Sequence, residues 1–253
     1  HRKKASKAKF CRLIEFGKAE PRLRSNIKKY MSSKKVTKNK IIAMVLSIVW
    51  KCGFRVGNIK YKELYDSYGI ATILKQHLKF TPSGIKIEFK GKKSVINKCN
   101  ITDKVIVDEL KKMVQNKTPK CFVFTYEKEG APTLIKPVEI NLFLNGYGKG
   151  TTSKDLRTFD ANIIFADFLK KNADRMKEAT SVAKRKKIAK EALEEVAHHI
   201  NNTPGISKSS YVLGALYEVA INQPKKFKSY FNDKLKTRLQ FIHFLEKIYC
   251  KPA

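Results

Sequence analysis

The sequence predicts a mainly α-helical protein with a small antiparallel β-sheet. Apolar residues recur at helical spacing in several segments, most clearly in Ile41–Lys51 and Ser181–Ile200. Between these two segments, Ile85, Ile87 and Phe89 alternate with polar residues, which is the period of a strand. Clusters of glycine, proline and asparagine separate the periodic segments and indicate turns.

The first forty residues are expected to form a basic arm. Residues 1–40 contain fifteen Lys or Arg but only two acids, Glu15 and Glu20, and their apolar residues show weak periodicity. We expect a mobile segment that lies along a polyanion, in preference to a charged tail that only aids solubility. Residues 41–253 then form the folded domain.

A buried helix is expected from about Ile41 to Lys51, followed by a turn. Thr37 is a suitable N-cap for this helix, and Gly53 is a residue that ends helices. This ending places Arg55 in the turn, where a guanidinium and a nearby glycine backbone can both approach a phosphate closely.

A small antiparallel sheet is expected between Ile70 and Ile101. Two of its strands are joined by the short connection Lys90-Gly-Lys-Lys93, which is typical of a tight turn. Gly91 is expected to supply the positive φ of this turn. Lys92 is therefore predicted to be a cation at a mobile hairpin tip.

The later segments predict mostly helices. They are a helix from Asp103 to Val114, a strand-like run from Cys121 to Tyr126, a helix from Val138 to Leu144, a helix that begins near Thr152, and C-terminal helical packing over Phe227–Tyr249. Asp155 lies in the first turn of the helix near Thr152, where a carboxylate interacts favourably with the helix dipole. We expect Lys154 and Arg157 on the same side of that helix, where both can meet one phosphate.

The charge of the chain points to a polyanionic partner. It contains 54 Lys and Arg against 22 Asp and Glu, a formal net charge of +32. Such a charge attracts nucleic acid without reading bases, so it does not by itself distinguish an enzyme from a binding protein. The longest apolar run, Ile41–Trp50, is interrupted by Ser47 and is far shorter than the roughly 20 residues that span a bilayer. No membrane association is expected.

The five cysteines are expected to be reduced intracellular thiols. They are an odd number, widely spaced, and form no CxxC pair that would indicate zinc or redox chemistry. Paired acids suited to magnesium are not evident either, so no metal or cofactor is predicted. The sequence shows no signal peptide and begins with His1 rather than Met, so we expect it to start inside a longer protein or after a removed tag.

Three short motifs combine one tyrosine with two separated arginines. They are Arg55-Val-Gly-Asn-Ile-Lys-Tyr61, Ser153-Lys-Asp-Leu-Arg157-Thr and Thr203-Pro-Gly-Ile-Ser-Lys-Ser-Ser-Tyr211. A phenol that attacks a phosphodiester needs cationic donors, because negative charge gathers on the two non-bridging oxygens. Two arginines from different elements can bracket those oxygens. The polar residues that precede Tyr211 argue against its burial.

Together with Phe89-Lys-Gly-Lys92, these motifs resemble the type IB DNA topoisomerases, most closely the small enzymes of poxviruses and other large DNA viruses. They occur in the order of that family and at compatible separations, over about residues 40–250. The resemblance implies a catalytic domain of the type IB topoisomerase and tyrosine recombinase kind over residues 41–253. The basic arm would then be the end of a missing N-terminal domain.

The resemblance also implies a role for each matching residue. Tyr211 would form a 3′-phosphotyrosyl bond, while Arg55 and Arg157 stabilise the transition state. Lys92 would protonate the departing 5′-oxygen, and Lys154 would assist beside Arg157. DNA contacts are expected from five further residues: Lys60, Tyr61, Lys93, Ser207 and Lys208.

The chain departs from the family pattern at two positions. Asn202 stands nine residues before Tyr211, where the family usually has a histidine. Its amide can donate the same hydrogen bond to a non-bridging oxygen but carries no charge. His199, one helical turn earlier, is an alternative donor. Lys93 follows the hairpin lysine where related enzymes commonly have an acid, so the same DNA preference is not expected.

The predicted function is relaxation of supercoiled double-stranded DNA by transient cleavage and religation of one strand. The predicted enzyme is a monomer that needs no cofactor, metal or small-molecule substrate and acts inside cells, in the virion or the host cytoplasm. A tyrosine recombinase shares the same catalytic groups and remains the nearest alternative. A non-enzymatic basic DNA- or RNA-binding protein is the alternative from another class. Since part of the DNA clamp is expected to be missing, binding should be weak and strongly salt-dependent.

Overall fold

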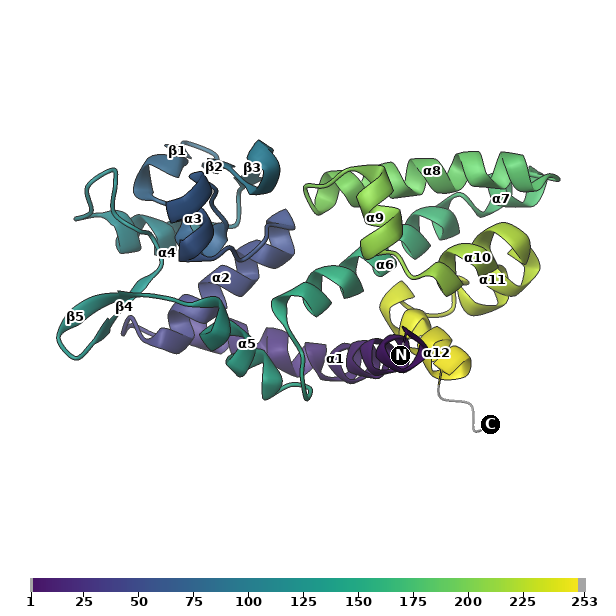
Figure 1. Ribbon diagram of the computed structural model, residues 1–253, viewed down its shortest axis with the longest axis horizontal. Helices are drawn as coiled ribbons and strands as arrows, with labels where there is room; N and C mark the ends of the chain where they lie inside the picture. The colour runs from purple at the N-terminus through teal and green to yellow at the C-terminus, as the bar shows by residue number, and fades with distance from the viewer. Residues whose placement is uncertain (1, 250–253) are drawn as a thin grey trace. The chain divides into compact units, whose positions relative to one another are not determined.

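A computed structural model describes residues 2–249, and it describes side chains from Phe10 onward (Figure 1). The chain forms two compact units, one made of His1–Glu20 with Tyr147–Ala253 and the other of Pro21–Gly146. Helices predominate, and the strands form two small antiparallel sheets. The predicted fold class is confirmed. The expected domain start at residue 41 lies inside the second unit.

The first forty residues do not form an arm. Arg2–Met31 is a single helix, α1, and its residues belong partly to each unit. Leu13 and Phe16 are buried in its first part, and Leu23 and Ile27 are buried in its second. The expectation of an extended strap was wrong because α1 buries apolar residues within two different units, so no single apolar stripe runs along it.

Helix α2, Lys38–Cys52, forms the core of the Pro21–Gly146 unit as the sequence predicted. The Thr37 hydroxyl accepts a hydrogen bond from the Lys40 amide, and Gly53 ends the helix with φ of 62°. Most residues between these caps are buried, including the Ile41 to Leu46 run. The chain therefore enters the Arg55 segment from a rigid, doubly capped helix.

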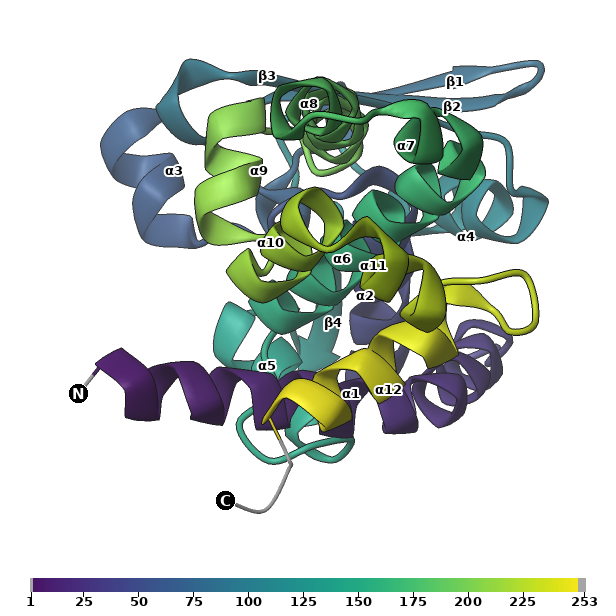
Figure 2. The ribbon, with the colours of Figure 1, turned by 90° about the vertical axis from the view of Figure 1, so that its right-hand side faces the viewer.

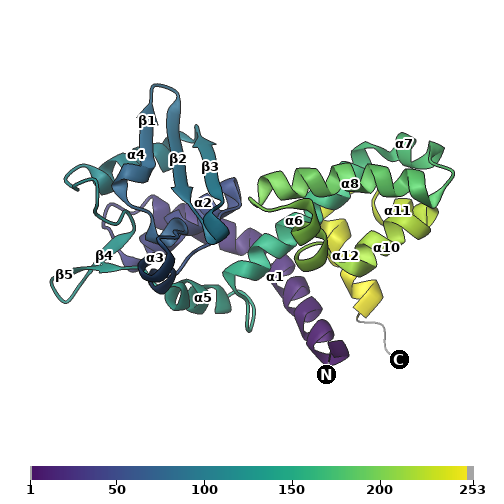
Figure 3. The ribbon, with the colours of Figure 1, turned by 45° about the horizontal axis from the view of Figure 1, so that its top comes forward.

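A three-stranded sheet follows in the same unit. Its strands β1, Leu78–Thr81, β2, Gly84–Lys90, and β3, Ile96–Ile101, pair antiparallel in that order and lie side by side in Figure 3. Ile85, Ile87 and Phe89 are buried on one face, as the alternation predicted. The other elements of this unit are α3 (Ile59–Tyr65), η1 (Ile70–Thr72), η2 (Lys75–His77), α4 (Lys104–Val114), β4 (Thr125–Lys128), β5 (Ala131–Leu134) and α5 (Pro137–Asn145).

The turn between β2 and β3 differs from its prediction. Gly91 has φ of −100°, whereas Lys93 and Ser94 in the short helix η3, Lys92–Ser94, both have φ of 59°. A Cβ atom on Gly91 would lie 2.1 Å from the side-chain nitrogen of Asn97. The glycine is therefore needed for close packing beneath Asn97 and not for a left-handed backbone.

Two cysteines are not free thiols, which corrects a further expectation. Cys52 at the end of α2 and Cys99 in β3 form a disulfide across 47 residues of chain. Cys11 and Cys121 are free, and Cys250 lies outside the described residues. The prediction failed because the cysteines were judged by their spacing in sequence, while the pairing depends on the packing of α2 against β3.

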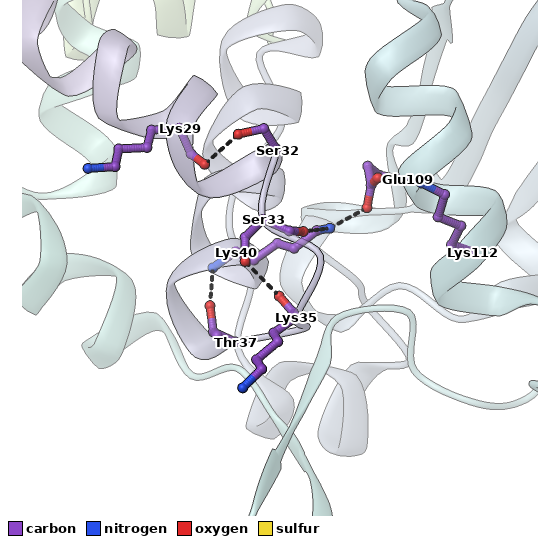
Figure 4. Close-up of polar contacts among 8 residues, drawn as sticks. All are labelled: Lys29, Ser32, Ser33, Lys35, Thr37, Lys40, Glu109 and Lys112. Atoms are coloured by element: carbon purple, nitrogen blue, oxygen red, sulfur yellow. Dashed lines mark hydrogen bonds and ion pairs between the residues drawn. The ribbon is translucent and has the colours of Figure 1, made fainter.

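A buried ion pair ties α2 to α4 (Figure 4). The Lys40 ammonium lies 2.5 Å from the Glu109 carboxylate and donates to the Ser33 carbonyl at 2.6 Å. Lys112 also donates to Glu109, at 2.8 Å. Burial alone would raise the pKa of Glu109, but the hydrogen bonds and charges of Lys112 and Lys40 outweigh burial and lower that pKa.

Acidification should therefore weaken this ion pair by protonating the Glu109 carboxylate. Because the folded-state pKa of Glu109 lies below its ordinary value, its stabilising contribution is present above the ordinary carboxylate range and is lost as the pH falls through the folded-state pKa. Urea unfolding at a series of acidic pH values should show a smaller loss of stability for Glu109→Gln than for the wild type. Glu129→Gln, whose side chain is 85% exposed, is the control and should follow the wild type. Equal pH slopes for wild type and Glu109→Gln would contradict the assignment.

The unit that includes residues 147–253 is entirely helical in the part that the structure describes. Its core helix is α6, Ser153–Lys171, and Figure 2 shows α8 above it and α12 below it. Phe159 of α6 packs edge to face against Phe241 of α12, with ring centroids 5.4 Å apart. The remaining helices are α7 (Ala173–Glu178), α8 (Val182–His199), α9 (Pro204–Ser210), α10 (Gly214–Asn222), α11 (Pro224–Tyr230) and α12 (Thr237–Tyr249).

The described residues include no helix with the length and apolar character needed to cross a bilayer.

Candidate active site

Arg157 and Tyr211 are in direct contact within one unit. The Arg157 side chain donates from one terminal nitrogen to the Tyr211 hydroxyl at 2.7 Å and from the other to the Ile200 carbonyl at 2.6 Å. The guanidinium carbon lies 5.0 Å from the centre of the tyrosine ring. Arg157 is 5% exposed, so both hydrogen bonds form in a largely water-free environment, where they are strong.

The first turn of α6 places Arg157. Asp155 caps the helix by accepting from the backbone amide of Thr152 at 3.0 Å and from its hydroxyl at 2.8 Å. Leu156 and Phe159 are fully buried, which sets the rotation of the helix about its axis. Lys154 is exposed, whereas Arg157 is buried, so the expectation that both face one phosphate from the same side is not met in this structure.

Tyr211 is 6% exposed, which contradicts the expectation that it would avoid burial. It directly follows α9, where the Thr203 hydroxyl accepts from the Ile206 amide and Pro204 occupies the first turn. The polar residues Ser209 and Ser210 face solvent, while Tyr211 begins a buried run that continues through Leu213. The polar residues of α9 therefore do not predict whether Tyr211, which follows them, is exposed or buried.

Asn162 is a residue that the sequence reasoning missed. Its side chain is fully buried and donates to the carbonyls of Thr158, at 2.7 Å, and Tyr211, at 2.9 Å. Its side-chain oxygen accepts from the Leu213 amide at 2.8 Å. Asn162 thus binds the backbone on both sides of Val212. The sequence contains a signal for this residue: it is a polar residue five positions after Arg157 whose immediate neighbours in the predicted helix are apolar.

Replacing Asn162 with Ala should destabilise the fold by about 2–4 kcal/mol, because buried carbonyl and amide groups lose their partners. Urea unfolding measures this loss. The matched control is Asn222→Ala, since Asn222 is exposed and its amide binds only the Glu218 side chain among the contacts described; its effect should stay within about 0.5 kcal/mol. A loss below about 1 kcal/mol for Asn162→Ala would show that these hydrogen bonds contribute little.

The residues around the missing family histidine are partly buried. Asn202 and His199 are both half-buried near the end of α8. Burial lowers the pKa of His199, and the charges of His198 and Arg157 lower it further against the opposing effect of Glu195. His199 is therefore neutral at neutral pH and lies within electrostatic range of Arg157.

Two expected DNA contacts in α9 differ sharply in exposure. Lys208 is exposed, and its ammonium lies 4.3 Å from the centre of the Tyr217 ring. Ser207 is fully buried, so its hydroxyl is not presented to a ligand in this structure, contrary to the expectation. The helix period explains the difference, because adjacent residues point roughly 100° apart.

Arg55 lies in the other unit, on a loop held by backbone contacts. The Arg55 carbonyl accepts from the Ile70 amide and the Val56 carbonyl from the Ala71 amide, both at 2.9 Å. Gly57 has φ of 84°, and a Cβ atom there would lie 2.6 Å from the Gly69 backbone. Two chain segments therefore touch directly at the base of this loop, which only glycine permits.

The exposed helix α3 follows this loop and has no buried residue. The Asn58 side chain caps it by accepting from the Lys60 amide at 3.0 Å. Lys60 is exposed and Tyr61 is 54% exposed, with its ring 5.9 Å from that of Tyr65. Lys60 and Tyr61 are thus accessible to a ligand, and their contact with DNA stays a prediction.

Lys92 and Lys93 are exposed at the turn between β2 and β3. This turn is closed by a hydrogen bond from the Gly91 amide to the Val95 carbonyl at 2.8 Å. The hairpin position predicted for Lys92 is therefore present. Among the described residues, no group of three or more His, Cys, Asp or Glu is placed to hold a metal ion.

The family model for the catalytic core of eukaryotic DNA topoisomerase I matches residues 1–235. The chain belongs to the type IB DNA topoisomerases. These enzymes are isomerases that relax supercoiled DNA, and the predicted function and enzyme class are confirmed at this level. The match begins at the first residue, so it includes the segment that was expected to be an arm.

Individual relatives, two of them viral, support the same assignment. The type IB topoisomerase resembles DNA topoisomerase 1B of Acanthamoeba polyphaga mimivirus, with 29% identity over 92% of this chain and 70% of the relative. It is 26% identical to DNA topoisomerase 1B of vaccinia virus over 65% of this chain and 49% of the relative. It is also similar to DNA topoisomerase 1 of Mycosarcoma maydis, with 23% identity over 72% of this chain and 19% of the relative. The resemblance inferred from four motifs is confirmed.

Proposed function

We propose that Tyr211 is the nucleophile of this topoisomerase and that Arg157 activates it. The observation that carries the proposal is the hydrogen bond of 2.7 Å from the Arg157 guanidinium to the Tyr211 hydroxyl. A cationic donor at the phenol oxygen stabilises negative charge on that atom when its proton leaves. Five of the ten tyrosines, Tyr30, Tyr61, Tyr65, Tyr68 and Tyr126, lie in the unit that does not contain Arg157.

The proposed reaction is a reversible transesterification. The Tyr211 oxygen attacks the phosphorus of one DNA strand while its proton passes to solvent water. A bond to the 3′-phosphate forms, and the bond to the 5′-oxygen breaks. Arg55 and Arg157 balance the charge on the non-bridging oxygens, and Lys92 gives a proton to the 5′-oxygen. The reverse attack by the 5′-hydroxyl reseals the strand. Because the phosphotyrosyl bond conserves the energy of the phosphodiester, the cycle needs neither ATP nor a metal ion.

Arg157 must become accessible to a phosphate for this reaction. In the free protein its two terminal nitrogens donate to Tyr211 and to the Ile200 carbonyl. These contacts hold Arg157 and Tyr211 in a buried position, 5% and 6% exposed, which leaves little surface for a phosphate. We therefore propose that DNA binding moves the Ile200 to Tyr211 segment, which contains Asn202, so that the phenol becomes accessible and an amide donor reaches the phosphate.

The residues proposed to contact the DNA backbone are assigned by the exposure of their side chains. Lys154 and Lys208, both exposed in one unit, and Lys60, Tyr61 and Lys93, all exposed in the other, supply contacts to the DNA backbone. Ser207 joins them only after α9 has moved. The protein acts as a monomer on double-stranded DNA. Its viral relatives support action inside cells, in a virion or the host cytoplasm.

Incubation with supercoiled plasmid in EDTA tests the proposed function. Relaxed topoisomers should appear without ATP or metal, and rapid addition of denaturant should trap protein on the 3′ side of a nick. Strand exchange between two duplexes by a tetramer would instead support the tyrosine recombinase alternative. Binding without relaxation or adduct would support a non-enzymatic role.

A further inference from the structure

The Cys52–Cys99 disulfide lies between the two segments of its unit that carry candidate catalytic groups. Cys52 is the last residue of α2, three positions before Arg55. Cys99 is in β3, where it pairs with Ile87 of β2. Three further residue pairs, at Lys98, Asn97 and Ile96, connect this point to the turn that carries Lys92. The disulfide therefore links the end of α2 to the hairpin by a short covalent path.

Non-covalent contacts also join the hairpin to the Arg55 loop. The ring of Phe54, next to Arg55, packs edge to face against Phe89 at 4.9 Å. The Tyr68 amide donates to the Lys90 carbonyl at 2.8 Å. Both contacts are made at Phe89 and Lys90, before the turn, and neither involves the exposed Lys92 side chain.

We propose that Cys52 and Cys99 are positioning residues for the proton transfer by Lys92, and that reduction of their disulfide lowers the rate of DNA cleavage. This inference depends on the proposed role of Lys92. The disulfide restricts the hairpin so that the Lys92 ammonium and the Arg55 guanidinium reach one phosphodiester together. Without it the hairpin explores more positions, and the fraction with Lys92 at the leaving oxygen falls.

The redox step balances with an ordinary dithiol as reductant. A thiolate of the dithiol attacks the Cys99 sulfur, because Cys99 is half-exposed whereas Cys52 is 5% exposed. A mixed disulfide forms and the Cys52 thiolate leaves. The second thiol of the reductant then displaces Cys99. The protein gains two electrons and two protons as two thiols, and the dithiol becomes a cyclic disulfide.

Single-turnover cleavage of two DNA substrates tests the inference. One substrate has the natural 5′-oxygen at the scissile bond, and the other has a bridging sulfur, which leaves readily without a proton. The oxidised wild type is compared with the dithiol-reduced wild type and with Cys52→Ser/Cys99→Ser. The free cysteines provide the matched control, Cys11→Ser/Cys121→Ser. Thiol counting by mass spectrometry establishes the disulfide, and circular dichroism establishes that each sample is folded.

Loss of the disulfide should slow cleavage of the oxygen substrate about tenfold. This is less than the full rate contribution of a general acid, because Lys92 is still present. Cleavage of the sulfur substrate should change less than about twofold, and reoxidation of the reduced wild type should restore its rate. The control variant should match the wild type. Equal rates on both substrates with and without the disulfide, equal slowing on both, or absence of the disulfide from the oxidised protein would each overturn the inference.

The Lys92→Ala variant distinguishes a failure of the inference about the disulfide from a failure of the proposed function. If Lys92 is the general acid, this variant loses cleavage of the oxygen substrate and keeps that of the sulfur substrate. A variant that cleaves both substrates at the wild-type rate would refute the role of Lys92 itself, and with it the inference. A selective loss in Lys92→Ala combined with no effect of reduction would refute only the role of the disulfide.

Discussion

Tyr211→Phe should abolish both the covalent DNA adduct and plasmid relaxation, a loss of about 10⁴-fold or more. The change removes one oxygen and keeps the aromatic ring, which is buried beside Arg157. Arg157 keeps its hydrogen bond to the Ile200 carbonyl. The local structure should therefore persist, and DNA affinity should stay within about twofold because phosphate contacts do not depend on the phenol.

The covalent adduct is measured on a denaturing gel with a labelled duplex that contains a single cleavage site. DNA affinity is measured by filter binding. Tyr217→Phe is the matched control, because Tyr217 is also a buried tyrosine of the same unit and its ring stacks against Phe165. It should cleave DNA at the wild-type rate. An adduct formed by Tyr211→Phe would mean that another residue is the nucleophile.

Arg157→Ala should slow cleavage by about 10²–10³-fold, as expected for the removal of a donor that stabilises developing negative charge. It should also cost about 1–3 kcal/mol of stability, because the Tyr211 hydroxyl and the Ile200 carbonyl lose their donor in a buried environment. Arg157→Lys should recover little activity, since one ammonium does not reproduce the planar geometry that spans both acceptors.

Single-turnover cleavage and urea unfolding measure these two effects separately. Arg175→Ala is the control, because Arg175 forms a paired contact with Glu191 on the surface of the same unit. Exposed pairs contribute little, so this variant should change neither quantity by much. Cleavage by Arg157→Ala within about threefold of the wild type would exclude the proposed role of Arg157.

Much of the fold was predictable because its signals are local. Thr37, Asp103 and Ser181 were each expected to begin a helix, and each accepts a hydrogen bond from the first turn of its helix. The alternation of Ile85 with its neighbours predicted the central strand of the three-stranded sheet. In the candidate site, the motifs correctly placed Arg55 in a loop and Lys92 on a hairpin.

The features that sequence reasoning missed depend on contacts between distant residues. Burial of Tyr211 follows from Arg157 and Asn162, which are 54 and 49 positions away. The Cys52–Cys99 bond likewise joins residues that are 47 positions apart. No local pattern contains this information, and α1 shows the same limit, since its two parts pack in different units.

The contact between Gly57 and Gly69 closes the base of the segment that they flank. Hydrogen bonds from Ile70 and Ala71 reinforce this closure, and α3 within the segment buries no side chain. The last part of this segment is also held, because Ser67 is buried and the Tyr68 amide donates to the Lys90 carbonyl. We therefore expect that replacing α3 with the equivalent helix of another topoisomerase would change the surface chemistry of this segment while leaving the backbone of Arg55 in place.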